Sequence, residues 1–122
     1  MELEPDAQAA AKARQILHSR VADIVPATVL WDLLTVVTEL VTNSVRHGPG
    51  DPIQVRITVN DDGSVRGEVE DQGDGEVALR EMVEDGPGGG MGLHLVQGLT
   101  ERWAVYEGST HVWFEMGPPA SE

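Results

Sequence analysis

Two stretches of the chain repeat apolar residues every three or four positions, which is the spacing of one helix face. The first, residues 7–24, predicts an amphipathic helix that ends before Pro26. The second predicts a helix from Thr28, its N-terminal cap, to His47, where a Gly-Pro-Gly sequence stops it. Residues that cover most of the circumference of this second helix predict burial on more than one side: Leu30, Leu33, Leu34, Val36, Val37, Leu40, Val41, Ser44 and Val45.

A period of two follows the second helix and is typical of strands with one solvated face. The alternation runs through residues 53–59 and resumes after a turn at 60–63, so residues 65–71 are predicted to form the antiparallel partner. Asp71 lies on the same alternating face as Val69. We therefore expect a carboxylate that points inward at the end of this strand.

The second half of the chain is expected to add a short helix at 76–83, a glycine-rich loop at 86–92 and a further helix after that loop. A hairpin with strands at 103–107 and 110–116 completes the pattern. This order predicts an α+β fold, a two-layer α/β sandwich with helices packed on one face of a mostly antiparallel mixed sheet. Because no repeat or linker divides the sequence, residues 1–122 are expected to form a single domain.

The charge of the chain narrows the classes of function. It has 21 Asp and Glu against 8 Lys and Arg, a net charge of −13, and no Cys. Binders of nucleic acid or anionic membranes need surface cations to neutralise phosphate, so neither partner is expected. Without Cys, disulfide scaffolds, thiolate zinc sites and a catalytic Cys are excluded. The amino terminus is acidic and the apolar stretch 29–45 contains Asp32 and Glu39, so a cytoplasmic protein is expected.

Glu39 and Asn43 are polar residues inside the otherwise apolar second helix. Four positions apart, they share one helix face about one turn from each other. Their oxygen atoms suit Mg²⁺, a hard cation that keeps water ligands and takes few from the protein. An alternative is that both lie on an exposed strip of the helix and hydrogen-bond to solvent or to each other.

Two glycine-containing segments complete the candidate chemistry. Residues 71–75 combine the inward Asp71 with two glycines, which would let a flat ligand approach the backbone while the carboxylate accepts from an exocyclic amine. The glycine-rich residues 86–92 precede a helix, where backbone N–H groups and the helix dipole favour an anion. The alternatives are an ordinary acidic turn and a flexible surface loop.

Taken in order, these segments resemble the N box, the G1 box and the G2 box of the GHKL superfamily of ATPases and kinases. The matching residues are 39–43, 71–75 and 88–93, and residues 39–47 are similar to the helix signature of the bacterial anti-sigma factor serine kinases. The resemblance spans nearly the whole chain. It implies a Bergerat ATP-binding fold, with ATP between the helical layer and a lid at residues 84–92.

The resemblance also implies a role for individual residues. Glu39 would be the catalytic general base, and Asn43 would ligate Mg²⁺. Asp71 would accept from the adenine amine. The nucleotide-binding residues would then be Asn43, Arg46, Asp71, Gly73, Gly75, Gly90, Met91, Gly92, Leu93 and Thr110. Among these, Arg46 would contact phosphate and Thr110 would support Asp71, whereas the remaining histidines, His18, His94 and His111, are expected to be structural or solvent-facing.

By the same resemblance, the expected activity is that of an ATP- and Mg²⁺-dependent serine/threonine protein kinase that regulates bacterial transcription by partner switching. Its partners would be a sigma factor and an anti-anti-sigma protein of the STAS type, and a homodimer is one possible assembly. The expected lid, residues 84–92, has no Lys or Arg, so a non-catalytic nucleotide-sensing module is the alternative. The strand that precedes the first helix in the family is reduced to residues 1–4, which predicts a sheet that lacks one strand or has a frayed edge.

Overall fold

The computed structural model describes residues 1–47, 50–71, 96–105 and 111–117. Two helices and five strands follow one another along the chain: β1 (Glu2–Leu3), α1 (Ala9–Val21), α2 (Ala27–His47), β2 (Ile53–Val59), β3 (Val65–Glu70), β4 (Arg102–Val105) and β5 (Val112–Met116). The strands form one sheet in the order β1-β2-β3-β5-β4, and the four pairings are all antiparallel.

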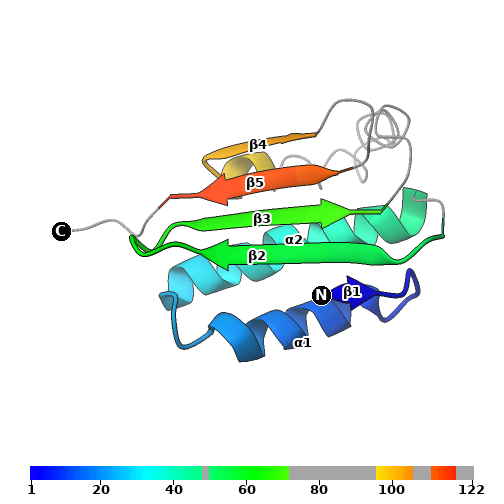
Figure 1. The fold of residues 1–122 in the computed structure, drawn as a ribbon, viewed down its shortest axis with the longest axis horizontal. Helices are drawn as coiled ribbons and strands as arrows, with labels where there is room; N and C mark the ends of the chain where they lie inside the picture. Colours follow the sequence, from blue (N-terminus) through cyan, green and yellow to red (C-terminus); the bar gives the residue numbers. More distant parts are fainter. Residues whose placement is uncertain (48–49, 72–95, 106–110, 118–122) are drawn as a thin grey trace.

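The helices and the sheet form the two expected layers. α1 packs against α2, and α2 crosses behind β2 and β3 on one side of the sheet (Figure 1). The core lies between the layers, where buried residues of α2 such as Leu33 and Val37 meet the inward faces of β2 and β3. The α+β two-layer sandwich predicted from the sequence is therefore confirmed.

The ends of the helices differ from the prediction in one respect. Both expected helices are present, and α2 ends at His47 as predicted. The expectation that Thr28 caps α2 is wrong, because the helix already begins at Ala27 and the N–H of Leu30 donates to the carbonyl of Pro26 over 2.9 Å. Pro26 therefore flanks the helix and supplies the carbonyl that accepts its first hydrogen bond.

The short amino-terminal segment forms a true edge strand. Glu2 pairs with Gln54 and Leu3 with Ile53. Beyond them, the Met1 ammonium group donates to the Val55 carbonyl over 2.6 Å, and the Val55 N–H donates to the Met1 carbonyl over 2.8 Å. The sequence predicted a sheet that lacks this strand or has a frayed edge. The first of these is wrong, because the strand is present, with a length of two residues.

The β2–β3 hairpin has the predicted strands and turn. The strands pair from Gln54 with Glu70 to Val59 with Val65. In the turn, the Asn60 N–H donates to the Ser64 carbonyl over 2.8 Å, and Gly63 has a φ of 87°. Such a positive φ favours glycine, which explains why this turn ends on Gly63.

Phe114 of β5 lies over Gly67 of β3 on the inward face of the sheet. The two residues are cross-strand partners, and the Phe114 side chain is fully buried. A Cβ atom built on Gly67 would lie 2.1 Å from Cζ of this ring. Only a residue without a side chain fits beneath the ring, and this close approach joins the two central strands.

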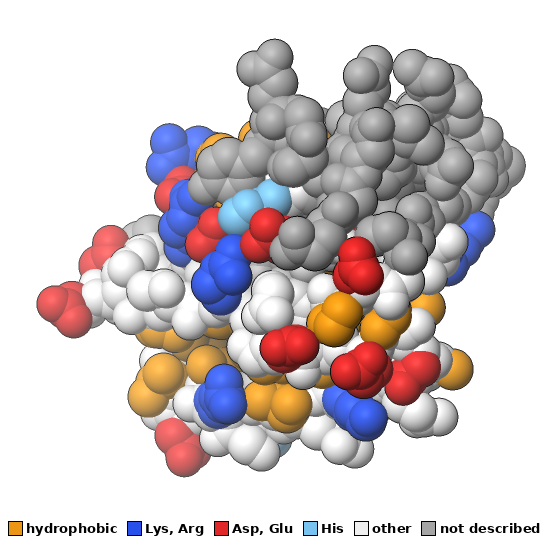
Figure 2. Space-filling view, turned by 45° about the vertical axis from the view of Figure 1, so that its right-hand side comes forward, with side chains coloured by type: hydrophobic (Ala, Val, Ile, Leu, Met, Phe, Trp, Pro, Cys, Tyr) orange, Lys and Arg blue, Asp and Glu red, His pale blue; other side chains and the backbone are white. Residues whose placement is uncertain are grey.

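The opposite face of the sheet carries charged side chains paired between strands. Arg56 of β2 lies 3.1 Å from Glu70 and 3.9 Å from Glu68 of β3. Arg66 of β3 lies 3.2 Å from Glu115 of β5, and its guanidinium is 4.8 Å from the centre of the Trp113 ring. Basic, acidic and histidine side chains accordingly gather beside one another on this face (Figure 2).

Part of the predicted second half of the chain is also described. Residues 96–99 are helical, with Val96 buried, in agreement with the helix expected after the glycine-rich loop. β4 and β5 form the expected hairpin pair. The expected helix at 76–83 and the glycine-rich loop at 86–92 lie outside the described residues.

Candidate functional site

Glu39 and Asn43 lie on the C-terminal half of α2, one turn apart. Both side chains are half-buried. Of the residues between them in the sequence, Leu40 and Val41 are buried and Thr42 is exposed. The pair therefore lies at the border between the core and the surface of the helix. Its carboxylate and amide remain accessible to a ligand while the helix fixes their spacing.

Asp71 follows β3 directly and continues its inward face. Its residue is 3% exposed, like Val65 and Val69 before it on the same face. Such burial confirms the predicted inward placement of this carboxylate. Because an isolated buried carboxylate would be strongly destabilising, a group at this position needs donors around it, and Asp71 does take part in an electrostatic or hydrogen-bonding interaction.

The fold brings these residues to one end of the sandwich. β3 runs toward Asp71, and α2 packs on β3 with its C-terminal half at the same end (Figure 1). Glu39 and Asn43 of the helical layer and Asp71 of the sheet thus lie at the same end of the sandwich, although they are separated by 28 or more positions along the chain. Arg46, exposed in the last turn of α2, belongs to the same end.

The donor atoms at this end suit a magnesium ion that also binds phosphate. Within the described part of the chain, there is no group of three or more His, Cys, Asp or Glu side chains that could enclose a metal by itself. The Asn43 amide oxygen is a hard donor, and Mg²⁺ usually takes only one or two protein ligands, with water and substrate phosphates as the others. The Asn43 amide oxygen could therefore be one of the few protein ligands of such an ion.

Several predicted site residues fall outside the described residues. These are the two glycines of the G1 box, the residues of the G2 box, the supporting threonine and the lid: Gly73, Gly75, Gly90, Met91, Gly92, Leu93, Thr110 and residues 84–92. Their roles stay predictions. The described site consists of Glu39, Asn43, Arg46 and Asp71.

Ser44, at the same end of α2, is a polar residue that the sequence analysis grouped with the apolar residues of the helix. Within the described residues, only Ser44 and Asp71 are buried polar or charged residues, at 7% and 3% exposed. The signal was available in the sequence, since a hydroxyl stands where the helical spacing from Leu40 and Val41 calls for another apolar side chain.

Two of the described histidines, His18 and His111, lie away from the candidate site. His111, at the start of β5, has its Nε2 2.8 Å from a Glu68 carboxylate oxygen on the outer face of the sheet. His18 is exposed on α1. These positions agree with the structural or solvent-facing roles expected for them, whereas His94 lies outside the described residues.

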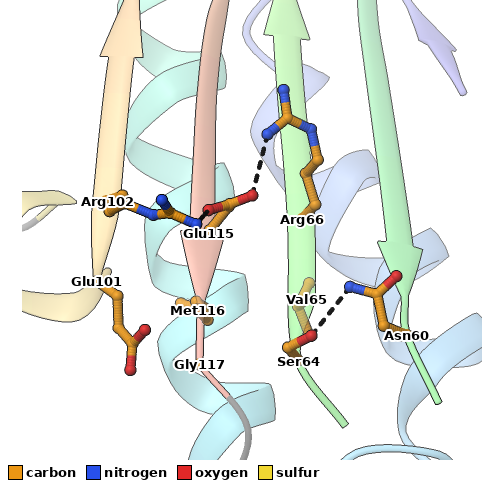
Figure 3. A pocket seen from close by; sticks show the side chains of 9 residues that line it. All are labelled: Asn60, Ser64, Val65, Arg66, Glu101, Arg102, Glu115, Met116 and Gly117. Carbon is orange, nitrogen blue, oxygen red and sulfur yellow. Dashed lines mark hydrogen bonds and ion pairs between the residues drawn. The ribbon is translucent and has the colours of Figure 1, made fainter. Parts of the chain in front are cut away.

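One groove borders the candidate site, and one pocket lies at the opposite end of the sheet. A groove of about 250 Å³ between α1 and α2 is lined by Arg14, Trp31, Leu34, Thr35, Thr38 and Glu39, so Glu39 borders it. A pocket of about 200 Å³ lies at the other end of β3, where Arg66 and Arg102 flank Glu115 (Figure 3). Because β3 begins at this pocket and ends at Asp71, the second hollow is separate from the candidate site.

Comparison with known proteins places this geometry in a family. The model of the histidine kinase-like ATPase domain matches residues 3–116, whereas no curated protein matches the chain significantly. The crystal structure of the RsbU and RsbW domains of Rv1364c from Mycobacterium tuberculosis is similar, with a TM-score of 0.69 and 21% sequence identity. The match covers 95% of this chain and 31% of that one, so the chain spans about a third of its neighbour's length.

The part of the chain that the structure describes contains no helix with the length and hydrophobicity of a membrane span. The family match begins at Leu3 in β1 and includes both helices and the other four strands that the structure describes. It agrees with the resemblance carried by residues 39–43 and 71–75. The chain belongs to the histidine kinase-like ATPase domain family.

Proposed function

We propose that the end of the sandwich where α2 and β3 terminate binds ATP together with Mg²⁺. The observation that carries this proposal is the convergence of the half-buried Glu39 and Asn43 with the buried Asp71 in a chain of this family. Asp71 accepts a hydrogen bond from the exocyclic amine of adenine, and Asn43 supplies one oxygen to the Mg²⁺ that neutralises the phosphates. Arg46 adds a positive charge beside them.

The segments outside the described residues complete the proposed site. Gly73 and Gly75 let the base lie close to the backbone, and Thr110 supports Asp71. The glycine-rich sequence from Gly90 through Met91 and Gly92 to Leu93 offers backbone N–H groups to the phosphates, and residues 84–92 form the lid. Residues 1–122 act as one nucleotide-binding domain.

The proposed reaction is transfer of the γ-phosphoryl group from ATP to a serine hydroxyl of a protein. Glu39 accepts the proton of the attacking hydroxyl, and Mg²⁺ when bound stabilises the charge on the phosphates. The resemblance of residues 39–47 to the anti-sigma factor serine kinases supports an anti-anti-sigma protein of the STAS type as phosphoacceptor and a sigma factor as second partner. The solved structure of similar fold includes an RsbW domain, in line with this choice.

Calorimetric titration with ATP in the presence of Mg²⁺ tests the nucleotide site. Wild-type protein should bind ATP, and Asp71→Asn should bind it much more weakly, because an amide can present its own N–H groups to the adenine amine. Asp61→Asn is the matched control, since Asp61 is an exposed carboxylate in the β2–β3 turn, at the opposite end of the strands from Asp71. Binding that is equal in all three proteins would rule out Asp71 as the adenine contact, and no binding in wild type would rule out the function.

Phosphotransfer is tested with labelled ATP and the STAS-type protein encoded beside the gene. Wild-type protein should phosphorylate a serine, and Glu39→Gln should lose most of the transfer, about 100-fold or more, while it still binds ATP. Transfer that survives in Glu39→Gln would show that Glu39 is not the base.

A second candidate function is a nucleotide sensor that changes a protein contact without catalysis. The observation that favours it is the lack of any Lys or Arg in residues 84–92, where a kinase would benefit from a positive charge near the γ-phosphate. Tight ATP binding with no transfer to any partner tested would support the sensor over the kinase.

A further inference from the structure

β3 and β5 lie side by side at the end of the sheet where Asp71 follows β3. Their antiparallel pairing runs from Val65 with Met116 to Val69 with Val112. Because the two strands run in opposite directions, the end of β3 lies beside the start of β5 (Figure 1). Asp71 comes two positions after the last of these pairs, where strands open most easily. Its placement therefore depends on how firmly the two strands are held together at this end.

A side-chain contact on the outer face of the sheet joins the two strands at this end. The Nε2 atom of His111, the residue before β5, lies 2.8 Å from a carboxylate oxygen of Glu68 on β3. The two side chains are only 18% and 24% exposed, so water screens this contact less than it screens an ordinary surface pair. Glu68 alternates with the inward-facing Val69, so the contact lies on the other side of the sheet from Asp71. His111 therefore acts on the strand end rather than on a ligand.

The charges around this contact balance only when His111 is protonated. Glu68 also lies 3.9 Å from Arg56 of β2, and Arg56 lies 3.1 Å from Glu70 of β3. Among the described residues, this group of ion pairs thus has one permanent cation and two carboxylates. Histidine is the side chain that ordinarily changes its charge between pH 5 and 8, and an imidazolium would balance the group. The contact between His111 and Glu68 should therefore be stronger at the lower end of this range.

We propose that His111 is a positioning residue for the nucleotide site, because it holds the start of β5 on the end of β3 and so keeps Asp71 in place. This inference rests on the proposed nucleotide site and adds a pH dependence to it. The Asp71 carboxylate meets the adenine amine in the productive position only while the strand end is held. The observed affinity is then the intrinsic affinity multiplied by the fraction of molecules in which the contact is closed, and protonation of His111 raises this fraction.

The test measures ATP affinity by calorimetry with saturating Mg²⁺ at about pH 6 and about pH 8, on either side of an ordinary histidine titration. His111→Gln keeps an N–H donor but cannot take up the charge. We expect it to weaken ATP binding about two- to fivefold at the lower pH, as for one cross-strand pair, and to have little effect at the higher pH. His111→Ala also removes the donor and should weaken binding at both pH values. Each variant is compared with wild type at the same pH, so titration of the nucleotide itself cancels.

Two control variants locate the effect, with unfolding in urea measured in parallel. His18→Gln removes an exposed histidine from α1 and should leave ATP affinity unchanged at both pH values. Arg66→Gln breaks the contact with Glu115 over 3.2 Å, which joins the same two strands at the end away from Asp71. It should lower the free energy of unfolding and leave ATP affinity close to that of wild type.

A purely structural His111 gives a different result. His111→Gln would then lower the free energy of unfolding but bind ATP as well as wild type at both pH values, and this outcome would overturn the proposal. An Arg66→Gln variant that loses as much affinity would overturn it as well, and an equal loss in His111→Gln at both pH values would overturn the role of the charge. Wild-type protein that binds no ATP at either pH would instead refute the nucleotide site itself, so the two failures are distinguishable.

Discussion

Gly67 shows how one missing side chain decides the packing of the central strands. Phe114 occupies the space above it, and any Cβ there would overlap the ring. We predict that Gly67→Ala destabilises the protein by about 2–3 kcal/mol, because a well-packed core cannot accept an added methyl group without strain. The free energy of unfolding in urea measures this loss.

Two further variants separate the clash from a general effect of removing glycine. Gly98→Ala should be neutral or stabilising by up to about 1 kcal/mol, since nothing lies within 4 Å of its added Cβ and residues 96–99 are helical. Gly67→Ala combined with Phe114→Leu should lose less than the sum of the two single losses. A strictly additive double variant would argue against the clash.

Asp62 illustrates a local contact with a measurable pKa. Its carboxylate accepts from the Ser64 hydroxyl over 2.6 Å and from the Ser64 N–H over 2.8 Å, and these bonds hold the pKa of Asp62 below its ordinary value. Because the pKa of Asp62 is lower in the folded protein, its two hydrogen bonds stabilise the fold at pH values above the ordinary carboxyl pKa. This stabilisation is lost as the pH falls through the lowered, folded-state pKa.

We predict that Ser64→Ala raises the pKa of Asp62 part of the way back, because the hydroxyl bond is lost and the backbone bond remains. NMR titration of the Asp62 side-chain carboxyl carbon measures the change. Thr58→Ala, which removes an exposed hydroxyl from β2, should leave this pKa where it is. A pKa that is the same with and without the Ser64 hydroxyl would contradict the assigned cause.

At the scale of elements, β1 tests how short a strand can be and still belong to the cooperative fold. Leu3 is 3% exposed although only two residues form the strand. We predict that Leu3→Ala lowers the free energy of unfolding by about 2 kcal/mol, because it removes a buried side chain at a site that can partly close. Hydrogen exchange at the Val55 N–H, which donates to Met1, should become faster.

Glu2→Ala is the control for this edge. Glu2 is exposed on the same strand, so its removal should change stability by less than about 0.5 kcal/mol. If Leu3→Ala were equally mild and exchange at Val55 stayed slow, β1 would not be part of the cooperative unit.

The elements also show which features a sequence can reveal. Long periodic segments predicted α2 and the β2–β3 hairpin with nearly the observed bounds, because hydrophobic spacing and turn residues act locally. The start of α2 was missed since the Pro26 carbonyl, rather than the Thr28 side chain, begins its hydrogen bonding. Two residues are too few to show a period, so whether β1 would form could not be predicted.

Features that depend on contacts between distant elements could not be predicted from the sequence. Alternation alone predicted that Asp71 points inward, because it continues the pattern of its own strand. The fit of Phe114 over Gly67 depends on the register between β3 and β5, which no local pattern specifies. Ser44 was counted with its apolar neighbours, and the structure shows that its polar side chain is indeed buried with them.

For the whole molecule, the distribution of charge determines how a nucleotide could bind. Between residues 61 and 85 there are ten Asp and Glu against Arg66 and Arg80, and Arg66 already pairs with Glu115. A triphosphate near such a segment is repelled unless a cation neutralises it. The described site adds Arg46 alone as a basic side chain, so the divalent ion supplies most of the neutralisation in the proposed complex.

We predict that removal of Mg²⁺ with EDTA lowers ATP affinity by about tenfold or more, because repulsion between unscreened charges is then uncompensated. Calorimetry at fixed ionic strength measures the loss. Adenosine, which carries no phosphate, should bind equally with and without Mg²⁺. Equal ATP affinity with and without Mg²⁺ would mean that other groups neutralise the phosphates.

The three tryptophans lie in two kinds of surroundings, and this gives the protein an internal optical probe. Trp31 is 64% exposed, whereas Trp103 and Trp113 are half-buried in the sheet and Trp113 is covered by the Arg66 guanidinium. Emission from Trp31 already reports water in the folded protein, so a shift of the fluorescence maximum on unfolding must come from the two sheet residues. Replacing Trp31 with Phe would leave a signal that follows exposure of this side of the sheet, where β5 pairs with both β3 and β4.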